Sequence, residues 1–115
     1  MKQRLLVMNS QRIVQHEEGG LWHNDKVDKA RSVKPSIYNL YLAAPANENM
    51  SHKGIILHVD ADSVYQQCGK NLIKHRLEYF AKVPEAGRTA SVVYEEELDA
   101  GIVGTTVSLE TIRHE

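Results

Sequence analysis

The sequence has little of what stabilises or targets small secreted proteins. Its single cysteine, Cys68, among 115 residues can form no internal disulfide, so nothing indicates an oxidising compartment. No apolar run approaches the roughly 20 residues that a membrane-spanning helix needs. The apolar part of the N-terminus is also too short for a signal peptide. We therefore predict a cytoplasmic protein without membrane contact.

The sequence also lacks the common motifs of catalysis and nucleotide binding. It contains no GxGxxG, Walker-type or GxSxG pattern, and its six histidines stand singly. His58 and His75 with Asp60 are the only combination that suggests zinc, and Cys68 with His75 the only one that suggests a nucleophile. Half-buried polar histidines and a small hydrophobic cysteine explain them more simply. We predict no catalytic residue, no metal and no cofactor.

Charge is unevenly distributed along the chain. Residues 1–53 carry a net charge of +3 and residues 54–115 a net charge of −4, for a total of −1. An acidic balance argues against strong binding to duplex DNA, which depends on basic charge. The densest acidic run reads as a solvated loop, or alternatively as a docking loop for a basic partner: Glu95, Glu96, Glu97 and Asp99.

The stretch from Gly54 to Tyr94 organises the fold. Runs rich in β-branched and other apolar residues alternate with turn-forming residues, which predicts strands near Gly54–Asp60, Ser63–Cys68, Leu72–His75 and Thr89–Tyr94. Leu77–Lys82 is predicted as one or two helical turns that plug the end of a barrel with Tyr79 and Phe80, and Ile102–Leu109 as a last strand.

The N-terminal part predicts a hairpin, a helix and a strand. Arg4–Met8 and Gln11–His16 flank a tight turn at Asn9-Ser10. Asn24 is a candidate N-cap for a helix over Asp25–Val33, and Ser36–Ala43 reads as a central strand.

The predicted fold class is mainly β (α+β). It is a small SH3- or OB-like bent antiparallel barrel or sheet with an N-terminal hairpin–helix–strand unit. The predicted boundaries are 1–43 for the N-terminal unit, 44–53 for a linker, 54–109 for the meander and 110–115 for a frayed tail. A homodimer through an edge strand such as Arg4–Met8 is a further expectation.

Two groups of residues carry a family resemblance. The first is Val64-Tyr65-Gln66-Gln67 with Gly69-Lys70 and His75, and the second is Val83-Pro84-Glu85-Ala86-Gly87 with Val92-Val93-Tyr94. Together they resemble the KfrB domain, a small domain found on conjugative plasmids and integrative elements. Segments 3–9, 24–30 and 34–41 are similar to its stand-alone plasmid versions, so the resemblance covers nearly the whole chain.

The resemblance implies a non-enzymatic accessory protein of plasmid maintenance or conjugative transfer. Such a protein acts as a protein-interaction module, with a plasmid-encoded KfrA-type regulator or a transfer protein as partner. Four recurrent polar side chains are not required by turns, so we predict that they form the interaction surface: Tyr65, Gln66, Lys70 and His75. The alternative function is weak binding of single-stranded nucleic acid or RNA by a small β-barrel, with Lys74 and Arg76 as contacts.

Overall fold

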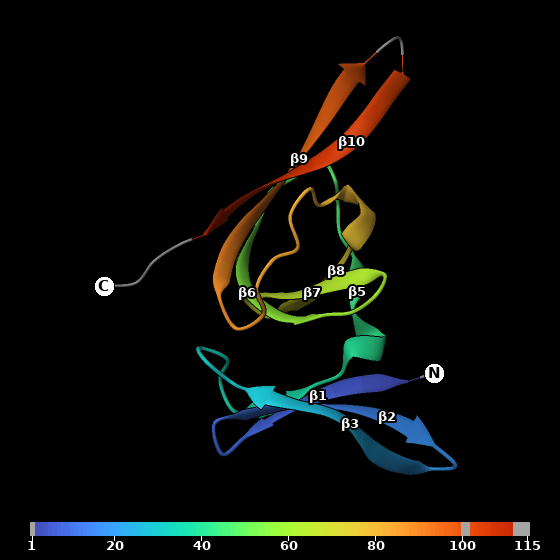
Figure 1. Cartoon of the computed structure of the whole chain (residues 1–115), viewed down its shortest axis with the longest axis vertical. Helices are drawn as coiled ribbons and strands as arrows, with labels where there is room; N and C mark the ends of the chain where they lie inside the picture. Colours follow the sequence, from blue (N-terminus) through green and yellow to red (C-terminus); the bar gives the residue numbers. More distant parts are fainter. Residues whose placement is uncertain (1, 100–101, 112–115) are drawn as a thin grey trace.

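The computed structural model describes residues 2–99 and 102–111, with side chains described up to residue 95. Within these ranges the chain forms strands arranged in two sheets and two short 3-10 helices (Figure 1). No helix in this part of the chain is long and apolar enough to cross a membrane. The elements, in chain order, are β1 Gln3–Met8, β2 Gln11–Glu18, β3 Leu21–Lys29, β4 Ser36–Tyr38, η1 Leu40–Leu42, β5 Ala44–Pro45, β6 His52–Val59, β7 Ser63–Cys68, β8 Asn71–Arg76, η2 Leu77–Tyr79, β9 Thr89–Asp99 and β10 Ile102–Thr111.

The first sheet is antiparallel, with strand order β3-β2-β1-β4. The predicted hairpin is confirmed, because β1 and β2 pair around Asn9 and Ser10, whose φ angles are 51° and 61°. Positive φ at both central residues is the geometry that matches the twist of a two-residue hairpin. β1 lies between β2 and β4, so it is not the free edge that the dimer prediction assumed.

The predicted helix over Asp25–Val33 is wrong. Residues up to Lys29 continue β3, which pairs with β2 from Gln11↔Lys29 to Glu18↔Leu21. A helix this short is stable only when it is docked, whereas the hairpin supplies a full row of backbone hydrogen bonds nearby. The alternating charges that suggested a helix instead suit an exposed edge strand, where they discourage pairing with other chains.

The second sheet has strand order β10-β9-β6-β7-β8-β5 and bends strongly (Figure 1). The predicted meander strands and the last strand are confirmed, but the sheet does not close into a barrel. The helical turns predicted for Leu77–Lys82 reduce to the 3-10 turn η2, followed by the buried side chain of Phe80. The run predicted as one long strand, Ser36–Ala43, splits into the edge strand β4 and the 3-10 turn η1.

Two hydrophobic clusters fill the interior. One lies within the second sheet and contains Ile56, Val64 and Val92. The other is shared, because Leu5 and Val14 of the first sheet pack together with Leu57 and Tyr65 of the second and with residues near them. Residues of the second sheet therefore contribute to both clusters, Leu57 and Tyr65 to one and Ile56 and Val64 to the other. The segment predicted as a linker, 44–53, includes β5 and the first two residues of β6.

The acidic run is part of a strand, not a loop. Glu95, Glu96, Glu97 and Asp99 belong to the outer half of β9, which pairs with β10 in a hairpin that extends away from the body in Figure 1. Glu95 is exposed, and the side chains of the other three lie outside the described ones. The docking role of this run stays a prediction.

Candidate functional site

The structure divides the predicted interaction surface into buried and exposed residues. Gln66 and His75 are 0% and 1% exposed, and Tyr65 is buried in the shared cluster. Lys70 is exposed at the turn between β7 and β8. The side chains of Gln66 and His75 therefore lie inside the fold. The interaction role of the four residues stays a prediction.

Gln66 and His75 form the centre of a buried polar network. The amide nitrogen of Gln66 faces the carbonyl oxygens of His52, Gly54 and Ala90 at 3.2, 3.1 and 3.0 Å. Its Oε1 lies 2.8 Å from Nε2 of His75. One glutamine thus joins β7 to β6, to β9 and, through histidine, to β8. No buried side-chain nitrogen or oxygen in the described part of the chain lacks a partner.

The network fixes the protonation of His75. Because Oε1 of Gln66 can only accept, Nε2 of His75 carries the proton and Nδ1 accepts from the Tyr94 hydroxyl, 2.5 Å away. Burial, with a smaller effect of His52, lowers the pKa of His75 to about 4. Burial also raises the pKa of Tyr94 to about 12. Both groups are held neutral, which suits a structural role better than proton transfer near neutral pH.

The residue combinations that suggested a nucleophile and a zinc site do not come together in the fold. The β7–β8 register places Cys68 opposite Asn71 and His75 opposite Val64, so the thiol and the imidazole are not cross-strand partners. Burial raises the pKa of the Cys68 thiol, the opposite of what a nucleophile needs. His58 pairs with Tyr65 on the other side of the sheet from His75. Among the described residues, no three His, Cys, Asp or Glu side chains are grouped to hold a metal ion.

Lys74 and Arg76, predicted as nucleic-acid contacts, are exposed neighbours on β8. Together they line two shallow clefts, one with Tyr79 and Tyr94 and the other with Asp62. Lys74 Nζ also lies 5.9 Å from the centre of the Tyr65 ring. Arg76 forms a 3.3 Å ion pair with Glu78, so its charge is partly offset. The structure therefore keeps these two cations together at the surface.

The outer face of the first sheet carries an uncovered apolar row that was not predicted. The strand registers align Ile37 with Leu6, Leu6 with Ile13, and Ile13 with Val27, across all four strands. Val27 and Ile37 are 52% and 51% exposed, and Leu6 and Ile13 are half-buried. These four residues are called the outer row below. The signal in the sequence was weak, since it consists of one apolar residue per strand on the face opposite the core.

Aromatic and basic side chains lie beside the outer row. The guanidinium of Arg4 sits 4.0 Å above the ring of Trp22, and Nζ of Lys2 is 5.3 Å from the ring of Tyr41. The two rings are 6.4 Å apart. Arg4 is held in place because its Nε donates to Gln15 Oε1 at 2.7 Å. Arg4, Lys2, Trp22 and Tyr41 are called the aromatic–basic cluster below.

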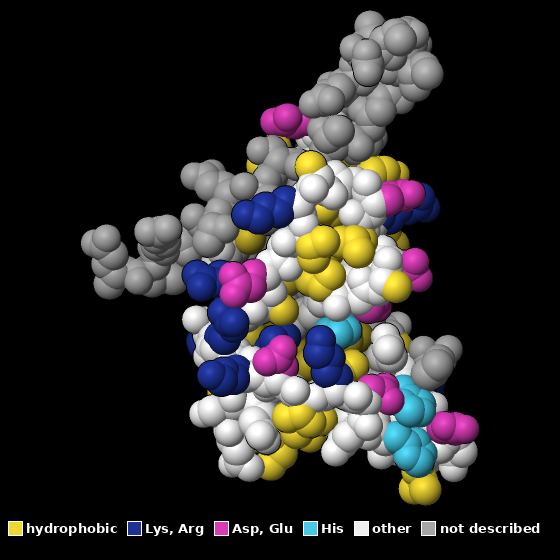
Figure 2. Space-filling model, in the orientation of Figure 1, with side chains coloured by type: hydrophobic (Ala, Val, Ile, Leu, Met, Phe, Trp, Pro, Cys, Tyr) yellow, Lys and Arg dark blue, Asp and Glu magenta, His cyan; other side chains and the backbone are white. Residues whose placement is uncertain are grey.

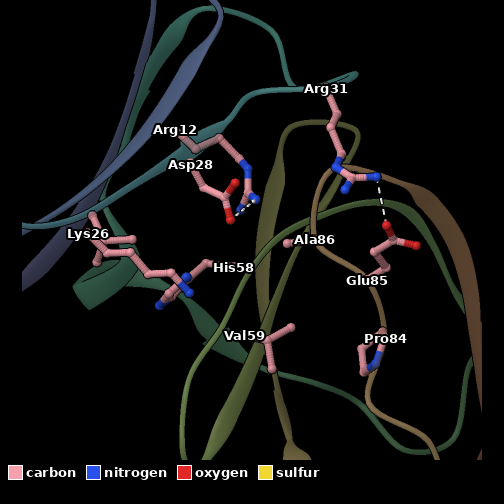
Figure 3. A pocket seen from close by; sticks show the side chains of 10 residues that line it. Arg12, Lys26, Asp28, Arg31, His58, Val59, Pro84, Glu85 and Ala86 are labelled. Atoms are coloured by element: carbon pink, nitrogen blue, oxygen red, sulfur yellow. Dashed lines mark ion pairs between the residues drawn. The ribbon is translucent and has the colours of Figure 1, made fainter.

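A cleft of about 190 Å³ opens where the two sheets meet (Figure 3). Arg12 and Lys26 line it from the first sheet, His58 from β6, and Glu85 from the loop before β9. Lys and Arg side chains gather around this junction on the face shown in Figure 2, with carboxylates among them. We call it the junction cleft.

Arginines hold the walls of the junction cleft together. Arg12 is only 6% exposed, donates from Nε to Lys29 O at 2.8 Å, and reaches across to Leu57 O at 3.1 Å. Its Nη2 also lies 3.5 Å from Asp28. Arg31 pairs with Glu85 at 2.6 Å. Because the Arg12–Leu57 and Arg31–Glu85 contacts join the N-terminal part of the chain to β6 and to the loop before β9, the cleft is part of the packing between the sheets.

Comparison with known proteins bears on the second half of the chain. Residues 51–103 match the family model of the KfrB domain. This segment is a KfrB domain. The match confirms the resemblance for residues 51–103, and this segment contains every residue of the Gln66–His75 network described above. The KfrB segment also supplies His58 and Glu85 to the junction cleft, whereas the outer row lies before it.

One curated relative covers more of the chain. Protein TraB of Escherichia coli is 31% identical over 94 residues, an alignment that spans 79% of this chain and 64% of TraB. The chain therefore covers less than two thirds of that relative. Together, the KfrB match and this likeness support an association with plasmids or mobile elements.

Proposed function

We propose that this chain is a non-enzymatic accessory protein of plasmid maintenance or conjugative transfer that acts as a protein-interaction module. The observation that carries the proposal is the outer row, since apolar side chains that line up across four strands and stay uncovered are typical of an interface. The neutral state of His75 and the raised pKa of the Cys68 thiol fit a binding role better than catalysis.

The chemistry around the outer row indicates the kind of partner. Arg4 lies on one side of the row and Lys29 on the other, on the same face of the sheet. A matching partner therefore presents an apolar surface flanked by acidic side chains. A second copy of this face would bring like charges together, which disfavours self-association here. Within the proposal, a plasmid-encoded KfrA-type regulator or a transfer protein is the first partner to test.

Charges placed in the outer row are expected to abolish partner binding. The test variant is Val27→Asp with Ile37→Asp, and the matched control is Val83→Asp, which changes another exposed valine outside the row. A partner captured from cells that carry the native element, and then purified, is titrated against each variant. We expect binding to weaken by roughly 100-fold or more in the double variant, because apolar contact is replaced by buried charge.

The same titration can reject the proposal. Thermal unfolding of each variant shows whether the sheet is intact, and substitutions at exposed edge positions should change stability little. A folded double variant that binds the partner as tightly as the wild type would show that the row is not the interface. A captured partner that loses affinity equally with Val83→Asp would show the same.

A second candidate function is favoured by the aromatic–basic cluster. Single strands bind to sheet faces where bases stack on aromatic rings and cations contact phosphate. Trp22 is the only tryptophan, so its fluorescence reports directly on stacking. We expect a single-stranded oligonucleotide to quench it at low salt, the quenching to fade as salt is added, and Arg4→Met to weaken binding several-fold. If Lys74→Met with Arg76→Met weakens binding instead, the contacts lie on β8. Unchanged fluorescence and no retention in a gel shift would exclude both locations.

A further inference from the structure

The junction cleft has one cation more than its carboxylates can neutralise. Arg12, Lys26 and Arg31 line it together with Asp28 and Glu85. Asp28 is paired with Arg12, and Glu85 is paired with Arg31 and, at 2.8 Å, with Arg88. Lys26 forms no ion pair with a carboxylate in the described part of the chain.

His58 supplies a second open polar group to the same space. His58 is 9% exposed, it lines the cleft, and none of the hydrogen bonds among the described residues involves its ring. No fully buried side-chain nitrogen there lacks a partner, so the ring nitrogens of His58 must be accessible from the cleft. Lys26 and His58 point into the same part of the cleft in Figure 3.

The groups that surround Lys26 in the cleft are held in fixed positions. His58 stacks on Tyr65, with ring centres 6.1 Å apart and planes 19° apart, so its ring orientation is fixed. Arg12 is fixed by its contacts with Lys29 and Leu57 across the two sheets. A rigid site loses little freedom when it binds, and a partly desolvated site strengthens attraction to charge.

We propose that the junction cleft binds one carboxylate of an acidic protein segment, through the ammonium of Lys26 and the ring of His58. A single negative charge matches the single surplus cation. A doubly charged phosphate would in addition meet Asp28 and Glu85 on the walls. The cleft is large enough for a glutamate or aspartate side chain, or for a chain terminus. The site is separate from the outer row, so either proposal can fail alone.

The test is an NMR titration of the full isotope-labelled chain with small probes. The probes are a blocked diglutamate peptide, a blocked diglutamine peptide of the same shape, and inorganic phosphate. We expect saturable shifts centred on His58 and Lys26 with the glutamate peptide, and none with the glutamine peptide. Lys26→Met should weaken glutamate binding roughly tenfold, the effect of one charge-assisted hydrogen bond.

Lys53→Met is the matched control for this titration. Lys53 is an exposed lysine on β6, the strand that carries His58, and it does not line the cleft, so its loss should leave glutamate binding unchanged. The wild-type spectrum serves as the reference for folding of both variants. The proposal is overturned if the glutamate peptide gives no saturable shift, if the glutamine peptide binds equally well, or if Lys53→Met has the same effect as Lys26→Met. Tighter binding of phosphate than of the glutamate peptide would overturn the assignment to a carboxylate.

Discussion

Replacing Gly54 by alanine is expected to lower the free energy of unfolding by more than about 3 kcal/mol, or to prevent folding. A Cβ at this position would lie 1.9 Å from the carbonyl oxygen of Gln67 and 3.0 Å from the Cα of Cys68. Both atoms belong to the backbone of β7, so no side-chain rotation relieves the clash. β6 can approach β7 this closely only because this residue has no side chain. Urea unfolding measures the resulting loss of free energy of unfolding.

Gly19→Ala is the matched control for this substitution. Gly19 has φ +61°, and nothing lies within 4 Å of a Cβ built there. Its replacement should cost only the strain of a left-handed residue, about 1 kcal/mol. Equal losses of stability in the two variants would contradict the close approach of the strands at Gly54.

Acidification from pH 6.5 to pH 4 is expected to destabilise the protein by about 3 kcal/mol through His75 alone. The folded pKa of about 4 lies below the ordinary value of 6.5. Between these two pH values His75 is protonated in the unfolded chain but stays neutral in the folded chain. The stability that neutral His75 contributes is therefore fully present above pH 6.5 and decreases as the pH falls. Below pH 4 it does not change further. His58, whose pKa burial also lowers, acts in the same direction.

Denaturant unfolding at several pH values, in wild type and in His75→Gln, isolates this contribution. The variant should be less stable at neutral pH, because Tyr94 and Gln66 lose a partner, and its stability should fall less steeply between pH 6.5 and pH 4. NMR of the wild type should show no titration of the His75 ring near pH 6.5. Identical slopes in the two proteins, or a ring that titrates near pH 6.5, would contradict the buried neutral state.

Local sequence patterns predicted the strands of the second sheet well, because turn-forming residues mark the ends of the strands. The run from Ser63 to Cys68 has turn residues on both sides, and its pairing with residues 71–76 follows from a short hairpin. The same reasoning failed at Asp25–Val33, where helix and strand differ little in local preference and pairing with β2 decides. Non-local pairing of this kind cannot be read from one segment.

The candidate sites were harder to predict than the strands. Gln66 and His75 look like surface residues because they are polar, yet their partners are carbonyls of β6 and β9 and a hydroxyl of β9, which only the fold brings close. The junction cleft joins Lys26 to His58, thirty-two positions further along the chain. Sequence indicated that Lys74 and Arg76 share a surface, because they are two positions apart on one strand.

The cluster that contains Leu5, Val14, Leu57 and Tyr65 has a consequence for how the polypeptide comes apart. Cleaving the backbone near residue 47 would leave each fragment with an exposed apolar surface that only the other fragment can cover. Neither fragment should then survive in isolation, and heating should melt the intact molecule in one step instead of two. The family match covers only residues 51–103, but the smallest segment that folds on its own should also include the strands that precede it.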